Sequence, residues 1–183
     1  LDLTYTRAGW RLLVGAEASS RAKWEFWGLP GNTEYDPAQQ DYTTWEVSLT
    51  KTFWLGDYMK LGVQVEHLDG SDLDRFSKYD FSFFGDSTVA GYQSGLVTAS
   101  RADAVHVDYG FNVGDVVRVG VRADAAWADD EVTGLDRELL AGVSLNGTLV
   151  GPWQTVVNFD VGVPVAGPAD GFTLSVAFLK LFD

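Results

Sequence analysis

Side chains in this sequence alternate between apolar and polar with a period of two residues over most of the chain. The clearest stretch covers residues 116–128, where Val119 and Val121 alternate with Arg118 and Arg122. Successive side chains of a β-strand point to opposite faces, so the pattern predicts strands with one apolar and one polar face. Helical periodicity is nearly absent, and we therefore expect an all-β fold.

About ten such stretches are expected to form strands. They span residues 1–6, 9–19, 22–28, 41–54, 58–67, 103–112, 116–128, 137–149, 152–163 and 172–182. Long polar connections at 28–41, 68–102, 129–136 and 164–171 contrast with short turns near 55–57, 113–115 and 150–152. Short periplasmic turns and long external loops are typical of outer-membrane barrels. The sequence predicts one domain, residues 1–183, folded as an antiparallel transmembrane β-barrel of about ten strands (8–12), or as the C-terminal part of a larger barrel.

Composition narrows the classes of function. The chain has no Cys, which excludes disulfide frameworks and thiolate metal sites. A net charge of −13 disfavours nucleic acid as a partner, because phosphates need clustered Lys and Arg. No apolar run has the length of a membrane helix, and no initiator Met or signal peptide is evident, which suggests a mature protein or a fragment. We expect no metal, no cofactor and no enzymatic activity.

Aromatic residues on the apolar faces gather near the expected strand ends, whereas the strand middles carry Val, Leu and Ala. The aromatic residues are Trp10, Phe111, Trp127, Trp153, Phe172, Phe178 and Phe182. Membrane barrels carry aromatic girdles at both interfaces, so this distribution favours a membrane barrel. A soluble β-sandwich or lipocalin-like barrel also alternates, with its apolar face inward, and stays open as an alternative.

The polar faces carry charges of both signs in mid-strand. The candidates for lumen-facing residues are Glu46, Glu66, Asp108, Arg118, Arg122, Asp124 and Asp160. They would tune permeation or hold an infolded loop; the alternative is a set of cross-strand pairs worth roughly 0.2–1 kcal/mol each. His106 shares this face and is expected to be a hydrogen-bonded wall residue. Acidic clusters at 69–74 and 129–131 are expected to be solvated loops instead of Ca²⁺ sites, and His67 with Ser71 is only a weak candidate for a catalytic pair.

The segment from Phe83 to Tyr92, FFGDSTVAGY, resembles the Gly-rich stretch and the Val-Arg-Gly-Phe/Tyr motif of the BamA-type outer-membrane assembly barrels, the bacterial surface antigen superfamily. In that family the motif lies in a large external loop that folds back into the lumen, and five strands follow it, as five candidate strands do here. The run from Ala141 to Phe182 resembles the family's last hairpin and terminal strand, and residues 28–33, GLPGNT, resemble another recurring element.

The resemblance implies site residues. It predicts an infolded loop tip at Thr88, Val89, Ala90, Gly91 and Tyr92, close to Arg118 or Arg122. Ala90 stands where the family has Arg, so we expect packing by Tyr92, instead of an ion pair, to hold the loop. The terminal strand with Phe178, Lys180 and Phe182 resembles the targeting signal by which the assembly machinery recognises barrel clients.

The function expected from this resemblance is protein insertion or translocation at the bacterial outer membrane, through the seam between the first and last strands and the loop 68–102. The expected partners are outer-membrane lipid, the barrel assembly machinery and other envelope proteins. One alternative is a small structural barrel or narrow pore that anchors envelope proteins, since about eight strands leave a lumen just filled by side chains. Another is a soluble ligand-binding β-barrel.

Overall fold

The computed structural model describes residues 8–22, 40–114, 116–151 and 155–180, and these residues form β-strands and connections. The long strands alternate apolar and polar side chains, as a sheet with two different faces requires. The strands are β1 (Gly9–Ser20), β2 (Asp41–Trp54), β3 (Met59–Ser71), β4 (Tyr79–Asp80), β5 (Thr98–Ala99), β6 (Arg101–Val113), β7 (Val117–Asp130), β8 (Leu135–Gly151), β9 (Thr155–Ala166) and β10 (Thr173–Lys180).

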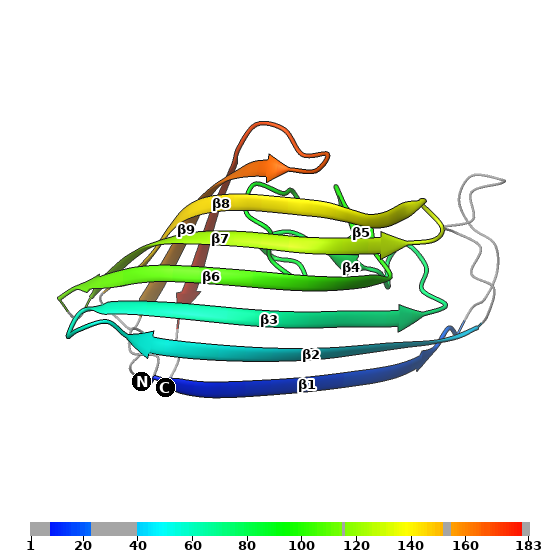
Figure 1. The fold of residues 1–183 in the computed structure, drawn as a ribbon, viewed down its shortest axis with the longest axis horizontal. Coiled ribbons are helices and arrows are strands. Elements are labelled where there is room, and N and C mark those ends of the chain that lie inside the picture. Colours follow the sequence, from blue (N-terminus) through cyan, green and yellow to red (C-terminus); the bar gives the residue numbers. More distant parts are fainter. Residues whose placement is uncertain (1–7, 23–39, 115, 152–154, 181–183) are drawn as a thin grey trace.

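Eight of these strands form one antiparallel sheet in the order β1-β2-β3-β6-β7-β8-β9-β10, and β4 pairs with β5 separately. The sheet curls, so that β9 and β10 lie behind the other strands in Figure 1, and β4 and β5 lie inside the curl. Among the described residues no ladder joins β1 to β10, and the described sheet is therefore open at these two edges.

The prediction of an all-β, antiparallel fold is confirmed. Eight of the expected strands correspond to the eight strands of the main sheet. The other two, at 1–6 and 22–28, lie outside the described residues, apart from Ala22, which forms a bend. The short strands β4 and β5 were not expected, because each has two residues and leaves no alternating pattern. The described residues contain no helix long and apolar enough to cross a membrane.

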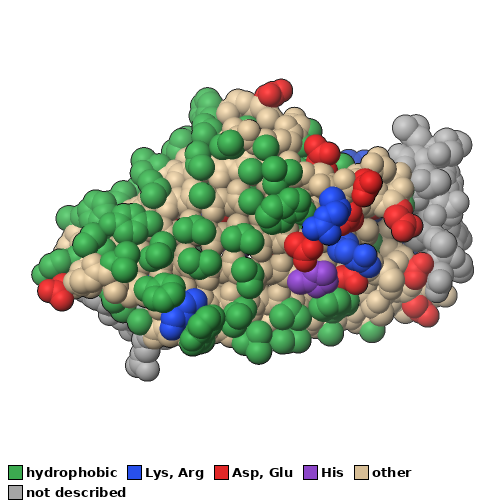
Figure 2. Space-filling view, in the orientation of Figure 1, with side chains coloured by type: hydrophobic (Ala, Val, Ile, Leu, Met, Phe, Trp, Pro, Cys, Tyr) green, Lys and Arg blue, Asp and Glu red, His purple; other side chains and the backbone are tan. Residues whose placement is uncertain are grey.

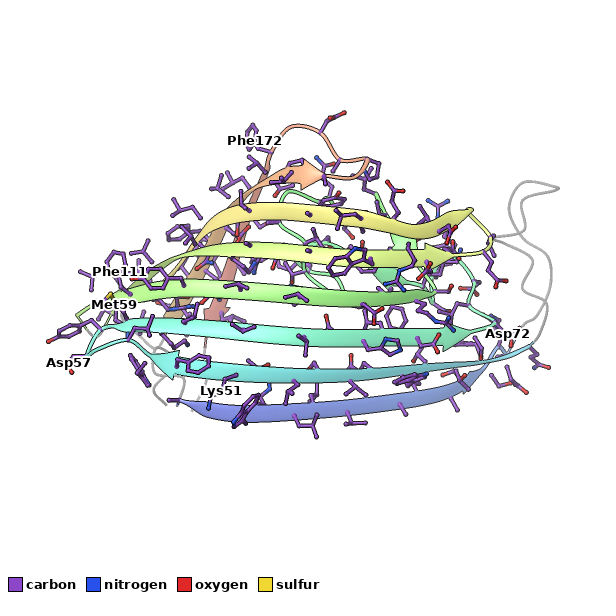
Figure 3. All side chains as sticks on the ribbon, viewed as in Figure 1. Lys51, Asp57, Met59, Asp72, Phe111 and Phe172 are labelled. Atoms are coloured by element: carbon purple, nitrogen blue, oxygen red, sulfur yellow. The ribbon has the colours of Figure 1, made fainter. Side chains whose placement is uncertain are left out.

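Long and short connections leave opposite ends of the sheet. The connections after β3, β7 and β9 leave one end, called the loop end here, and those after β2 and β6 leave the other, the turn end. In Figure 3, Asp72 marks the loop end, whereas Asp57, Met59 and Phe111 mark the turn end. The sequence predicted this alternation; which end lies outside a cell stays a prediction.

The two faces of the sheet differ in polarity. The outer face exposes apolar side chains: Leu12 is 65% exposed, Val121 52% and Phe178 77%. Figure 2 shows hydrophobic side chains over most of this face, with charged ones gathered near the loop end. The inner face carries polar and small side chains, among them Arg122 and Asp124. This arrangement is inverted relative to a water-soluble sandwich, whose apolar face is buried.

The buried apolar core lies between the inner face and the long connection after β3. The sheet contributes small side chains, Ala102 and Ala104 from β6 and Ala126 and Ala128 from β7, all at most 2% exposed. The connection contributes large ones, including Phe81 and Tyr92. Alanines on the wall thus leave the space that the connection fills, which explains how a segment of chain fits inside the curl.

Candidate functional site

The connection between β3 and β6, residues 72–100, folds back against the inner face and is called the plug loop here. The short pair β4 and β5 gives it a backbone frame through Tyr79 and Ala99. The carboxylate of Asp80 organises the adjoining turns, since it accepts hydrogen bonds from Ser94 Oγ at 2.7 Å and from the Gly95 amide at 3.0 Å. The loop is therefore a folded element with its own polar contacts.

A buried ion pair fixes the plug loop near the loop end. Lys78 Nζ lies 2.7 Å from Asp130 Oδ2, and both side chains are 1% exposed. Thr133 Oγ1 also donates to this carboxylate oxygen at 2.6 Å. Two charges buried away from water are tolerated because each compensates the other. Removal of either one leaves an uncompensated buried charge, which destabilises the fold.

The tip of the plug loop lies directly on the backbone of β8 and β9. A side chain on Gly142 would overlap the carbonyl oxygen of Ala90, and one on Gly162 would overlap the amide of Gly91. Gly91 has a φ of +85°, in the left-handed region that favours glycine, and it rests against Pro164. Glycines on both sides thus allow a contact between backbones.

A charged side chain on the wall also holds the tip. The Ala90 amide donates to Asp124 Oδ2 at 3.0 Å, and Arg122 Nε donates to the same oxygen at 3.0 Å. Arg122 reaches Asp160 Oδ2 with its other end at 3.3 Å, and Ser144 Oγ donates to this oxygen at 2.8 Å. An arginine therefore lies next to the loop tip, but it is Arg122 of β7 and not a residue of the loop, which has Ala90 at the motif's Arg position.

A second branch of the same network runs toward β3. His106 Nδ1 lies 2.9 Å from Asp124 Oδ1, and its Nε2 lies 3.4 Å from Glu66 Oε2. Ser87 Oγ of the plug loop donates to Glu66 Oε2 at 2.7 Å. Both carboxylates that flank His106 therefore also accept a hydrogen bond from the plug loop, Glu66 from Ser87 and Asp124 from the Ala90 amide.

The structure brings together four of the seven charged residues expected in the lumen: Glu66, Arg122, Asp124 and Asp160. Nearer the turn end, Arg118 pairs with Asp108, which also accepts a hydrogen bond from Asn146 Nδ2 at 3.1 Å. Glu46 stands apart on β2, where its side chain lies over Gly15.

The expected loop-tip residues lie against the inner face. Val89, Ala90 and Tyr92 are at most 2% exposed, and the Tyr92 hydroxyl donates to the Ala166 carbonyl. The tip contacts Asp124 and, through it, Arg122. In the terminal strand, Phe178 points outward, Lys180 is the last residue of β10, and Phe182 lies outside the described residues.

The acidic loop clusters are engaged with nearby side chains. Asp74 pairs with Arg21 at 3.0 Å, Asp69 with Arg101 at 2.9 Å, and Asp130 with Lys78. No group of three metal-ligating side chains occurs within the described part of the chain.

The residues of the weak catalytic candidate contact other groups. His67 Nδ1 lies 2.7 Å from Asp103 Oδ1, and Ser71 Oγ lies 2.8 Å from Thr43 Oγ1.

The contacts between the plug loop and the inner face are charge-assisted hydrogen bonds, and their chemistry is suited to holding a segment of chain in place.

Sequence reasoning missed several residues of the site. Gly142 and Gly162 looked like ordinary strand glycines, and Lys78 had no visible partner. A signal was present nonetheless: small residues recur on the polar side of neighbouring strands, at Ala104, Ala126 and Gly142. Small inner-facing side chains on adjacent strands indicate a surface on which another segment of chain can pack.

No family model matches the chain, and no curated protein matches it in sequence. Its function is therefore inferred from its own residues and their geometry.

Proposed function

We propose that this chain forms the wall of a bacterial outer-membrane β-barrel and takes part in protein insertion or translocation there. The observation that carries the membrane assignment is the exposed apolar outer face combined with a polar inner face. In water this face would leave large side chains such as Leu12, Val143 and Leu145 uncovered. Contiguous apolar patches of this kind mark protein or membrane contacts.

The height of the apolar band supports contact with lipid. On β2, Trp45 and Phe53 are both exposed on the outer face, 40% and 42%, and Leu49 lies midway between them. The two aromatic residues are eight positions apart, roughly 27 Å along the strand at about 3.4 Å per residue, which gives about 20 Å of height for a strand tilted by about 35–45°. Membrane barrels have an apolar band about 25 Å tall between aromatic girdles.

Two features support a role in insertion or translocation. The plug loop folds against the inner face as the resemblance to BamA-type barrels leads one to expect, and its tip is held by Asp124. Within the described residues β1 pairs only with β2, and β10 only with β9, so backbone groups on the outer side of each edge strand can pair with a further strand. A seam that opens beside a lumen loop would let a client strand add to the wall.

Neighbouring leucines of β1 test the membrane assignment. Leu12 is 65% exposed on the outer face at the level of Leu49, and Leu13 is 43% exposed on the inner face. Arg at a lipid-facing position near the midplane costs about 2–4 kcal/mol. We expect Leu12→Arg to abolish or slow folding into bilayers, and Leu13→Arg to fold nearly normally, as measured by the heat-modifiable mobility of the folded barrel on gels.

The variants Leu12→Arg and Leu13→Arg also distinguish a membrane barrel from a soluble ligand-binding barrel. In a soluble ligand-binding barrel both leucines face water, so both variants would fold alike and purify without detergent. That outcome would overturn the proposal.

The insertion role is tested by reconstitution. Liposomes that contain the chain should accelerate the folding of a urea-unfolded outer-membrane barrel client, measured as the rate of protease protection. Empty liposomes and liposomes with an unrelated porin are the controls. Equal rates in all three would remove the insertion role while leaving the membrane assignment standing.

A small structural barrel or narrow pore that anchors other envelope proteins is the second candidate. The observation that favours it is the buried Lys78–Asp130 pair, which ties the plug loop firmly inside the sheet. Planar bilayer recordings address it: small, steady conductance without client-folding activity would favour the second candidate over the first.

A further inference from the structure

We propose that the inner face binds a tetrahedral oxyanion of the phosphate or sulfate type, held by Lys60 and Arg118 beneath the tip of the plug loop. A cavity of about 330 Å³ lies there, between β2, β3, β6 and β7, with Ser87 and Thr88 of the loop above it. It has room for roughly ten water molecules at about 30 Å³ each, and therefore for an oxyanion with part of its water shell.

The Lys60 ammonium has no direct partner among the described residues. Among the charged residues that line the cavity, Lys60 alone has no hydrogen bond or ion pair within the described residues. The carboxylates around it are already engaged: Glu66 by Ser87 and His106, and Asp108 by Arg118 and Asn146. Asp108 attracts both cations, Arg118 through an ion pair and Lys60 without a direct contact, and it offsets one of the two positive charges. An oxyanion would offset the other, because a half-buried ammonium without a direct partner is unfavourable.

Glycines bring the two cations together and keep the space open. Lys60 is paired in register with Gly110, and the Arg118 guanidinium lies across Gly110, with Nη2 3.0 Å from where a Cβ would stand. At Gly62 the nearest atom to such a Cβ is the Asp108 carbonyl oxygen, 3.9 Å away. Lys60 and Arg118 thus face the same hollow, which no side chain from Gly62 fills.

The remaining lining suits an oxyanion. Thr52 and Thr88 contribute hydroxyl groups, and Lys and Arg are the residues that bind phosphate through charge-assisted hydrogen bonds. Asp86 at the roof accepts a hydrogen bond from the Asp80 amide at 2.9 Å and otherwise repels an anion, which limits affinity. This binding site is independent of the insertion role, and its test gives a result whether or not that role holds.

Isothermal titration of the detergent-purified chain with inorganic phosphate, at constant ionic strength in chloride, measures the site. We expect saturable binding that weakens at least tenfold in Lys60→Gln. Lys51→Gln is the matched control, because Lys51 lies on the outer face, 4.7 Å from the centre of the Trp10 ring, and its loss should leave binding unchanged. Equal affinity in wild type and Lys60→Gln overturns the proposal.

Two further variants keep the test valid if Lys60→Gln fails to fold. Gly62→Val fills the cavity without a change of charge and should abolish binding, whereas Asp86→Asn removes the repelling carboxylate and should tighten it. Unchanged affinity in both overturns the proposal.

A parallel titration with short-chain phosphatidylglycerol separates the sources of the oxyanion. Binding of inorganic phosphate indicates a free ion. Lys60-dependent binding of the lipid alone indicates a headgroup phosphate, and binding of neither overturns the proposal.

Discussion

The inner face of the sheet is packed toward the loop end and open toward the turn end, although the same strands build both halves. Along β6 the inner positions change from Ala102 and Ala104 to His106 and Asp108. Along β7 they change in the same way, from Ala128 and Ala126 to Asp124 and Arg122. The change falls at the level where the tip of the plug loop ends.

The difference shows how one strand serves two purposes. Small side chains leave room for Phe81, Val89 and Tyr92 of the plug loop, and full burial of a large apolar side chain stabilises by about 1.5–3 kcal/mol. Charged side chains at the boundary then accept hydrogen bonds from backbone amides and hydroxyl groups of the plug loop, as Asp124 does from the Ala90 amide. Beyond the boundary the charges line a cavity instead of a packed contact.

The largest effect is expected from breaking the buried ion pair of the packed half. Lys78→Met leaves Asp130 charged, buried and without its cation, which costs about 3–5 kcal/mol. Urea unfolding in detergent micelles should show this loss of free energy.

The control for this variant also removes the charge of Asp130, which Lys78→Met leaves without a cation. Lys78→Met combined with Asp130→Asn keeps an acceptor for Thr133 and should recover most of the lost stability. If the single and double variants unfold at the same urea concentration, the pair does not hold the loop, and the contrast between the two halves is weaker than described.

An intermediate effect is expected where the loop tip meets the wall. Gly142→Ala places a methyl group against the Ala90 carbonyl oxygen and should destabilise by about 1–3 kcal/mol. Gly62→Ala in the open half meets no atom closer than 3.9 Å and should be neutral or stabilising by about 0.4–1 kcal/mol. Proteinase K should cut the plug loop faster in the first variant only; equal cleavage would place the tip elsewhere.

The strands were predictable because alternation is a local property of the sequence, and the stretch from Val117 to Trp127 shows it without any knowledge of neighbours. The contact of Gly142 with Ala90 was not predictable in the same way, because it depends on the path of a loop distant in sequence. The Lys78–Asp130 pair joins residues 52 positions apart, and neither residue type indicates its partner. Resemblance suggested the loop tip and its position close to Arg118 or Arg122, but the contact through Asp124, which accepts from both the Ala90 amide and Arg122, appears only in the structure.

The smallest effect is expected at the rim, where the plug loop begins in contact with solvent. Burial of Asp74 would raise its pKa, but hydrogen bonds from Arg21, Ser77 and the Phe76 amide, with the charge of Arg21, outweigh burial and hold the pKa below its usual value. The stabilisation from a lowered pKa is present above the unfolded value, about 3.9, and disappears as the pH falls through the folded value. Asp74→Asn should therefore lose about 1 kcal/mol at pH 7, the usual size of one hydrogen bond, and less as the pH falls below about 4. Urea unfolding of both proteins from pH 3 to pH 7 measures the difference, and a difference independent of pH would show that the Asp74 carboxylate does not stabilise the rim through its charge.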